Sequence, residues 1–149
     1  MKKFAIATMI ALAATAASAL EVGITTARDY AGNNRNATGI TVGEKFGAAT
    51  LTAGFDRATL GTNDQDRYSL VAGYNVAKLG PVTVAVKGGA AYLNNQTGQD
   101  GYAALIGVGG TLPVTKQVSL TVDATRQYGQ DRVNSFDGNR VTAGVKYSF

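Results

Sequence analysis

The sequence predicts an all-β chain, an eight-stranded antiparallel up-and-down transmembrane β-barrel. Three observations lead to this prediction. Apolar and polar residues alternate with a period of two in eight segments of about ten residues each. The connections between these segments alternate between tight turns and longer polar loops. A secretory signal precedes the first segment.

Residues 1–19, MKKFAIATMIALAATAASA, have the three parts of a signal peptide. Lys2 and Lys3 give a positive start, an apolar stretch follows, and Ala17 and Ala19 stand in the A-x-A spacing. We expect cleavage after Ala19, which leaves residues 20–149 as one outer-membrane barrel domain. The alternative, an uncleaved membrane anchor, is disfavoured because the apolar stretch is short and ends in small residues.

Composition excludes several kinds of function. The chain has no Cys, which excludes a disulfide framework and a thiolate zinc site, and no His, the commonest general base and metal ligand. Without the two signal-peptide lysines, 12 of the 14 basic residues remain against 10 acidic ones, so the mature chain is only +2. We therefore expect no cofactor, no metal site and no nucleic-acid partner.

The predicted strands are rich in Val, Thr, Ile and Tyr. They are Leu20–Tyr30, Ala37–Phe46, Ala49–Ala58, Arg67–Lys78, Val82–Leu93, Tyr102–Leu112, Val118–Tyr128 and Arg140–Phe149. Tight joins follow the second, fourth and sixth strands, and longer polar joins, among them residues 59–66, follow the others. A meander of this kind places all tight turns at one end of the barrel and all longer loops at the other.

Each predicted strand has an apolar face and a face of Thr, Ser and Gly, with Glu44 near a tight turn as the clearest exception on the apolar face. A soluble, lipocalin-like barrel would turn the polar face outward and would need long charged side chains there. Because the polar face is made mostly of small residues, it suits a crowded lumen better. The apolar face then suits lipid, and a closed barrel leaves no backbone group unpaired.

The last nine residues, VTAGVKYSF, resemble the closing strand of bacterial outer-membrane β-barrels. The alternating positions are Val141, Ala143, Val145, Tyr147 and Phe149. In that class of protein the segment is the signal read by the barrel-assembly machinery, and the resemblance implies the same for these five residues. With its signal peptide and eight predicted strands, the chain is similar in architecture to the small barrels of the OmpA/OmpX-like superfamily.

The resemblance implies a monomer in the outer membrane of a Gram-negative bacterium, in contact with outer-membrane lipid and lipopolysaccharide. Enzymes of this architecture that trim lipid A, cut phospholipids or cleave peptides depend on a catalytic His, which this chain lacks. A non-enzymatic structural or surface-interaction role is therefore expected. A narrow porin-like diffusion channel and a surface adhesin are the alternatives.

Five charged residues project by parity toward the predicted lumen, where isolated charges are costly and pairing is expected. This lumen charge network comprises Glu21, Asp56, Lys87, Asp123 and Lys146. Glu21 and Lys146 lie near the same rim, on the two strands that must meet to close the barrel. A structural plug fits the small bore of eight strands better than an ion path, although the inward glycines leave a narrow pore open as an alternative.

Three arginines, Arg28, Arg57 and Arg126, fall by parity on the lipid side at the loop end of upward strands. In the sequences ARDY and TRQY, Tyr30 and Tyr128 follow two residues after the Arg, as expected of interfacial aromatics. We predict that the three arginines contact lipopolysaccharide phosphates, which match the guanidinium fork. The alternative is that they pair with Asp29, Asp56 and loop acids as solvated surface charges.

Overall fold

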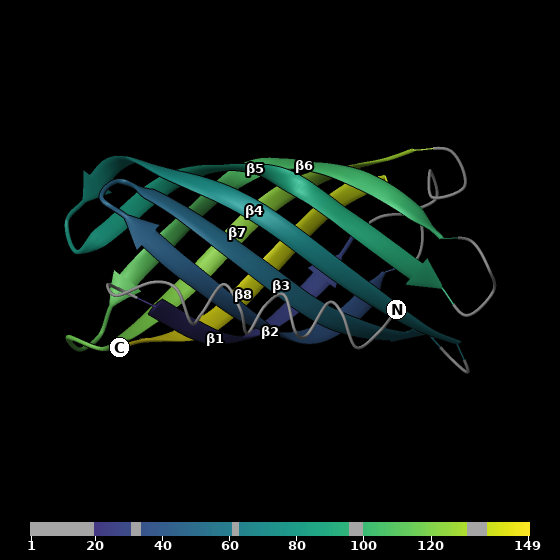
Figure 1. Cartoon of the computed structure of the whole chain (residues 1–149), viewed down its shortest axis with the longest axis horizontal. Coiled ribbons are helices and arrows are strands. Elements are labelled where there is room, and N and C mark those ends of the chain that lie inside the picture. The colour runs from purple at the N-terminus through teal and green to yellow at the C-terminus, as the bar shows by residue number, and fades with distance from the viewer. Residues whose placement is uncertain (1–19, 31–33, 61–62, 96–99, 131–136) are drawn as a thin grey trace.

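The computed structural model describes residues 20–30, 34–60, 63–95, 100–130 and 137–149. They form a closed, all-antiparallel barrel in which each strand pairs with its sequence neighbours and β1 pairs with β8 (Figure 1). The strands are β1 (Leu20–Asp29), β2 (Arg35–Phe46), β3 (Ala49–Leu60), β4 (Asn63–Leu79), β5 (Val82–Asn95), β6 (Gly101–Pro113), β7 (Val118–Gly129) and β8 (Gly138–Ser148). The predicted fold class is confirmed. Within the described ranges there is no helix long and apolar enough to cross a bilayer.

Seven of the eight strands, all but β1, are longer than predicted at the end that carries the polar connections, called here the loop end. The largest difference lies between β3 and β4, where pairing continues to Leu60 and Asn63. The prediction of a long loop at residues 59–66 is therefore wrong. The reason is that apolar alternation ends with the lipid-facing band, whereas the backbone hydrogen bonds of a ladder continue without apolar side chains.

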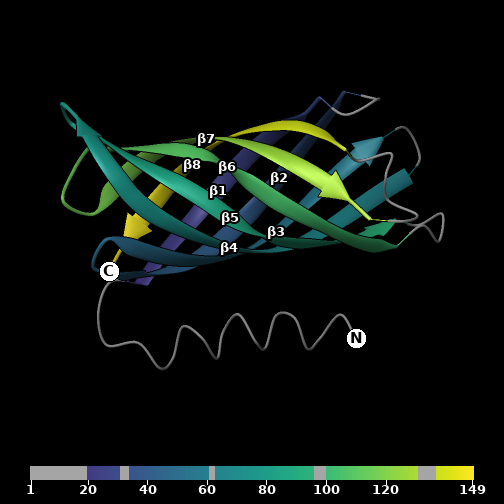
Figure 2. The ribbon, with the colours of Figure 1, turned by 90° about the horizontal axis from the view of Figure 1, so that it is seen from above.

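The opposite end, called here the turn end, carries the tight connections and Phe149 (Figures 1 and 2). Gly47 and Gly80 adopt φ values of 62° and 60°, a left-handed conformation that favours glycine. In the third connection the Thr115 hydroxyl accepts hydrogen bonds from the backbone N–H groups of Gln117 (3.2 Å) and Val118 (2.9 Å). Glycine backbone conformation thus favours the first two turns, and side-chain hydrogen bonds stabilise the third.

The outer face of the barrel is apolar. Ile24, for example, is 71% exposed, and Ile40, Val86, Ile106 and Val122 are exposed in the same way. The soluble, lipocalin-like alternative is therefore wrong, because it requires these residues inside.

Aromatic side chains form two bands on the outer face. The band near the loop end contains Tyr30, Phe55, Tyr68, Tyr92, Tyr102 and Tyr128, and the band near the turn end contains Phe46, Tyr74, Tyr147 and Phe149. Cross-strand partners pack against each other, with ring centroids 5.1 Å apart for Phe55 and Tyr68 and 5.2 Å apart for Tyr92 and Tyr102. Two such bands are typical of the two interfaces of a membrane barrel.

Candidate functional site

The loop end of the lumen is crossed by a closed ring of five side chains, called here the lumen ring: Asp29, Arg140, Asp56, Arg67 and Gln127. Arg140 contacts Asp29 (2.9 Å) and also Asp56 on the far side (3.0 Å). Arg67 lies 3.2 Å from Asp56 and donates a hydrogen bond to Gln127 (2.9 Å). Gln127 donates to Asp29 (3.0 Å), which completes the ring. Its members come from β1, β3, β4, β7 and β8, so the ring joins opposite walls of the barrel.

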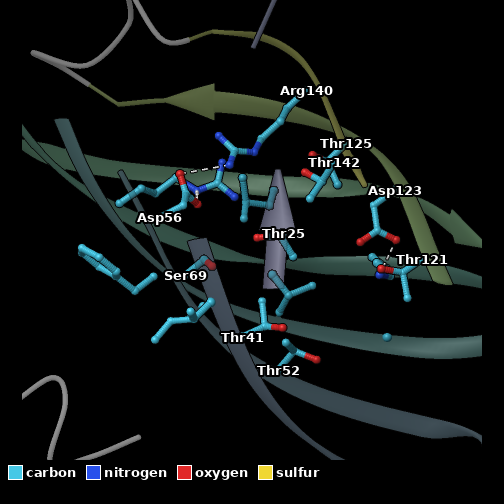
Figure 3. A pocket seen from close by; sticks show the side chains of 18 of the residues that line it. Thr25, Thr41, Thr52, Asp56, Ser69, Thr121, Asp123, Thr125, Arg140 and Thr142 are labelled. Carbon is cyan, nitrogen blue, oxygen red and sulfur yellow. Dashed lines mark hydrogen bonds and ion pairs between the residues drawn. The ribbon is translucent and has the colours of Figure 1, made fainter. Parts of the chain in front are cut away.

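The lumen ring is buried and electrically balanced. The Arg140 side chain is 3% exposed and that of Asp56 is 11% exposed. Two guanidinium groups face two carboxylates, so opposite charges and hydrogen bonds offset part of the desolvation cost. The Nε atoms of Arg67 and Arg140 are buried without a hydrogen-bond partner among the described residues. Figure 3 shows the contact between Arg140 and Asp56 at one side of the cavity.

Two lysine–carboxylate pairs lie deeper in the lumen. Lys87 Nζ on β5 lies 2.5 Å from Asp123 Oδ1 on β7. Lys146 Nζ on β8 lies 3.3 Å from Glu21 Oε2 on β1, across the strand pair that closes the barrel. Charge pairs therefore lie at three levels of the lumen, from the loop end to the turn end.

Between these charges lies a small cavity with about 90 Å³ of water-accessible space. Hydroxyl side chains dominate its wall: Thr25, Thr41, Thr50, Thr52, Ser69, Thr121, Thr125 and Thr142 (Figure 3). A space of this size and polarity can hold a few water molecules.

Gly109 makes room for the middle charge pair. A Cβ atom at this position would lie 2.7 Å from Lys87 Cε and 3.0 Å from Lys87 Nζ, and closer still to the Asp123 carboxylate. Real Cβ contacts are longer than this, so any side chain at residue 109 must displace the pair. The glycine is thus tied to a specific interaction in the lumen.

The structure places the five predicted lumen residues at all three levels, with Asp56 in the lumen ring and the other four in the two lysine pairs. The sequence prediction missed Asp29, Arg67, Gln127 and Arg140. Alternation could have found them. Each is next in the chain to a residue that faces outward (Arg28, Tyr68, Tyr128 or Val141), so its own side chain must point inward. Asp29 was instead interpreted as a solvated surface charge.

The three predicted rim arginines have different surroundings. Arg57 contacts its cross-strand partner Asp66 through two hydrogen bonds (2.7 and 3.1 Å). Asp66 belongs to the predicted loop 59–66, so Arg57 pairs with a loop acid as the alternative expected. Asp29 and Asp56, the other partners named there, face inward to the lumen ring, and for them the alternative is wrong. Arg28 and Arg126 are exposed on the face formed by β7, β8 and β1.

Arg28 and Arg126 share a second kind of contact. Each guanidinium carbon lies 5.6 Å from the ring centroid of the tyrosine two residues later, Tyr30 or Tyr128. Arg126 also donates a 3.4 Å hydrogen bond to Asn139, which lies between the two arginines on β8. Among the described residues neither arginine has an acidic partner.

The five residues of the predicted assembly signal occupy the outward positions of β8 and the residue after it. Val141, Ala143, Val145, Tyr147 and Phe149 are exposed on the outer face. The rings of Tyr147 and Phe149 contact each other edge to face, with centroids 5.0 Å apart. Recognition of these residues by the assembly machinery remains a prediction. In the described part of the chain, no group of three acidic, His or Cys residues could hold a metal ion.

A closed barrel of eight antiparallel strands with an apolar outer face, two aromatic bands and a polar lumen defines an outer-membrane β-barrel protein. Residues 1–148 match the family described as "YfaZ precursor", and the chain belongs to this family. A precursor with a cleaved signal peptide, exported to the Gram-negative outer membrane, agrees with this assignment.

Solved structures of outer-membrane barrels share this fold. The Neisserial surface protein A (NspA) superposes with a TM-score of 0.62 at 16% identity, covering 88% of this chain and 96% of that one. The Yersinia pestis attachment invasion locus protein Ail gives 0.57 at 13% identity, with 89% and 97% covered. The outer-membrane enzyme PagL gives 0.50 at 12% identity, with 85% and 98% covered. A search of curated proteins gave no significant match.

Proposed function

We propose that this protein is a non-enzymatic outer-membrane barrel, closed to solute flow, that acts at the cell surface by binding lipopolysaccharide. The lumen ring is the observation that supports a barrel closed to solute flow. Its five side chains join β1, β3 and β8 to β4 and β7, and the Arg140 side chain at its centre is 97% buried. A solute entering from the loop end would have to separate buried, hydrogen-bonded charges, which is costly.

The residues of the chain also support a non-enzymatic role. The same fold occurs in an outer-membrane enzyme, so the fold itself does not decide the matter. Acid–base catalysis needs a titratable side chain positioned against a substrate. The sequence has no His, and the lumen carboxylates Glu21, Asp29, Asp56 and Asp123 are all engaged by Lys or Arg.

The closed state is tested by conductance in planar bilayers, with the refolded wild-type barrel and the Lys87→Ala variant. We expect no discrete channel events in either, because the lumen ring remains intact in both. Channel events in the wild type whose conductance changes in Lys87→Ala would contradict the proposal. They would favour the alternative function, a narrow diffusion pore, which the hydroxyl-lined cavity between the charge levels supports.

The surface role rests on Arg28 and Arg126. In membrane barrels the longer loops face outward, so the loop end meets the phosphates of lipopolysaccharide. The two arginines lie on the outer face there, one on each side of β8, opposite Val141 and Asn139. Two strand spacings across and two residues along the strand place their backbones about 12 Å apart. Tyr30 and Tyr128 hold them at the level of the aromatic band. Among the described residues no carboxylate engages either guanidinium group, so both can form charge-assisted hydrogen bonds with phosphate.

The chain provides its own control for this proposal, because Asp66 already neutralises Arg57. We expect the Arg28→Gln/Arg126→Gln double variant to retain about tenfold less lipopolysaccharide on purification, and Arg57→Gln to retain nearly the wild-type amount. Lipopolysaccharide with dephosphorylated lipid A should bind the wild type as weakly as the double variant binds the intact form. Equal retention by all three proteins would exclude the arginines as the contact.

A further inference from the structure

Glu44 is a carboxylate in an apolar position. It lies on the outer face of β2 near the turn end, where its side chain is half-buried. Its cross-strand partners are Leu20 on β1 and Leu51 on β3, and it lines a small surface depression with Val42 and Leu70. Within the described residues Glu44 takes part in no ion pair. A charge held against apolar side chains is costly unless an opposite charge accompanies it.

The partner across the ladder from Glu44 is the residue that follows the predicted cleavage site. Hydrolysis of the Ala19–Leu20 peptide bond adds the water hydroxyl to the Ala19 carbonyl carbon and a proton to the Leu20 nitrogen. The products are a carboxylate on the released peptide and an ammonium group on Leu20. The backbone nitrogen of the residue paired with Glu44 thereby becomes a cation.

Two contacts hold Leu20 in place for such a pair, and a third observation excludes its neighbour Glu21 as the partner. Leu20 faces Glu44 in the β1–β2 register, and cross-strand neighbours have Cβ atoms about 5 Å apart. On the other side of β1, the backbone N–H of Phe149 donates a 3.0 Å hydrogen bond to the Leu20 carbonyl oxygen. The neighbouring carboxylate, Glu21, points into the lumen and is engaged by Lys146. The Leu20 nitrogen lies on the β8 side of β1, as its carbonyl does, so the flexible Glu44 side chain would reach it over the outer face from β2.

We propose that Glu44 is the binding site for the α-ammonium group that signal-peptide removal creates on Leu20. The ion pair exists only in the processed protein. It fixes the first residue of β1 against β2, next to the β1–β8 closure, and it compensates the charge of Glu44 at the membrane interface. Processing and the final closure of the barrel at its turn end are thus coupled.

The test measures the pKa of the α-amine in the mature barrel purified from outer membranes. Reductive methylation with ¹³C-formaldehyde labels amines without removing their charge, and NMR separates the α-amine signal from the lysine signals during a pH titration. Because a nearby carboxylate favours the protonated amine, we expect Glu44→Gln to lower this pKa by about 0.5. Asp100→Asn, which removes an exposed carboxylate at the loop end, should leave it unchanged.

A second variant separates the ion pair from a general effect of the substitution. Refolded barrel with two glycines before Leu20 displaces the amine from Glu44. Its α-amine pKa should fall to the value measured in Glu44→Gln. Adding Glu44→Gln to the extended barrel should then lower the pKa no further. An α-amine pKa that is equal in the wild type and Glu44→Gln would overturn the proposal. An intact mass that places the mature N-terminus elsewhere than Leu20 would overturn it as well.

Discussion

The two ends of the lumen handle charge in different ways. At the loop end, Arg140 is 3% exposed and contacts two carboxylates that belong to the five-membered lumen ring. At the turn end, Lys146 is 15% exposed and contacts the single carboxylate of Glu21 at 3.3 Å. The first arrangement is a shared, buried network, and the second is an isolated pair close to the opening.

The difference follows from the chemistry of the two cations. A guanidinium group is planar and presents five donors in a fixed fork, so one arginine can bridge Asp29 and Asp56 at once. An ammonium group is a compact charge that retains water well and suits a partly hydrated pair. The lumen therefore has arginines in the buried ring at the loop end and lysines in the two pairs nearer the turn end. Removing a cation should consequently cost more at the loop end.

The largest expected effect is that of Arg140→Met. The substitution leaves Asp29 and Asp56 with less compensation in a buried site, and breaking a buried ion pair typically costs about 3–5 kcal/mol. We expect a loss of that order in the free energy of unfolding, measured by urea titration of the refolded barrel in detergent micelles. A loss no larger than that of the equivalent change at Lys146 would remove the proposed distinction between the two ends.

An intermediate effect is expected for Gly109→Ala in the middle of the lumen. The added methyl group must displace the Lys87–Asp123 pair. Because the atoms it meets are the ends of flexible side chains, the cost should lie in the lower part of the range for overpacking, about 1–2 kcal/mol. Gly88→Ala on the adjacent strand is the matched control, because a Cβ there has only the Leu105 carbonyl oxygen within 4 Å, at 3.9 Å. The same urea titration should show little change for the control. Equal losses for the two variants would mean that Gly109 has no special relation to the charge pair.

The sequence predicted the barrel well because its two faces obey a local rule. Period-two alternation depends only on neighbouring residues, so it identified all eight strands and placed Glu21, Lys87, Asp123 and Lys146 toward the lumen. The rule ends where the apolar band ends. For that reason it missed the extension of β4 to Asn63 and the lumen position of Arg140.

Two features could not be obtained from alternation at all. The register shift between Asn75 and Ala77 inserts one residue into β4, which keeps Leu79 opposite outward-facing Val82 and is invisible in a count of apolar residues. The lumen ring joins residues as far apart in the chain as Asp29 and Arg140. Such contacts depend on the closure and tilt of the barrel, and parity fixes only the face on which each residue lies.

The smallest effect is expected for Lys146→Met at the turn end. Glu21 is left without its cation, but its side chain is 21% exposed and the contact it loses is long, at 3.3 Å. The loss in the free energy of unfolding should therefore be about 1 kcal/mol or less, near the upper end of the range for surface ion pairs. Adding Glu21→Gln removes the uncompensated charge as well and should recover part of that loss. If the double variant is less stable than Lys146→Met alone, Glu21 has a stabilising contact other than Lys146. The closure of β1 on β8 would then depend on the carboxylate itself rather than on the pair.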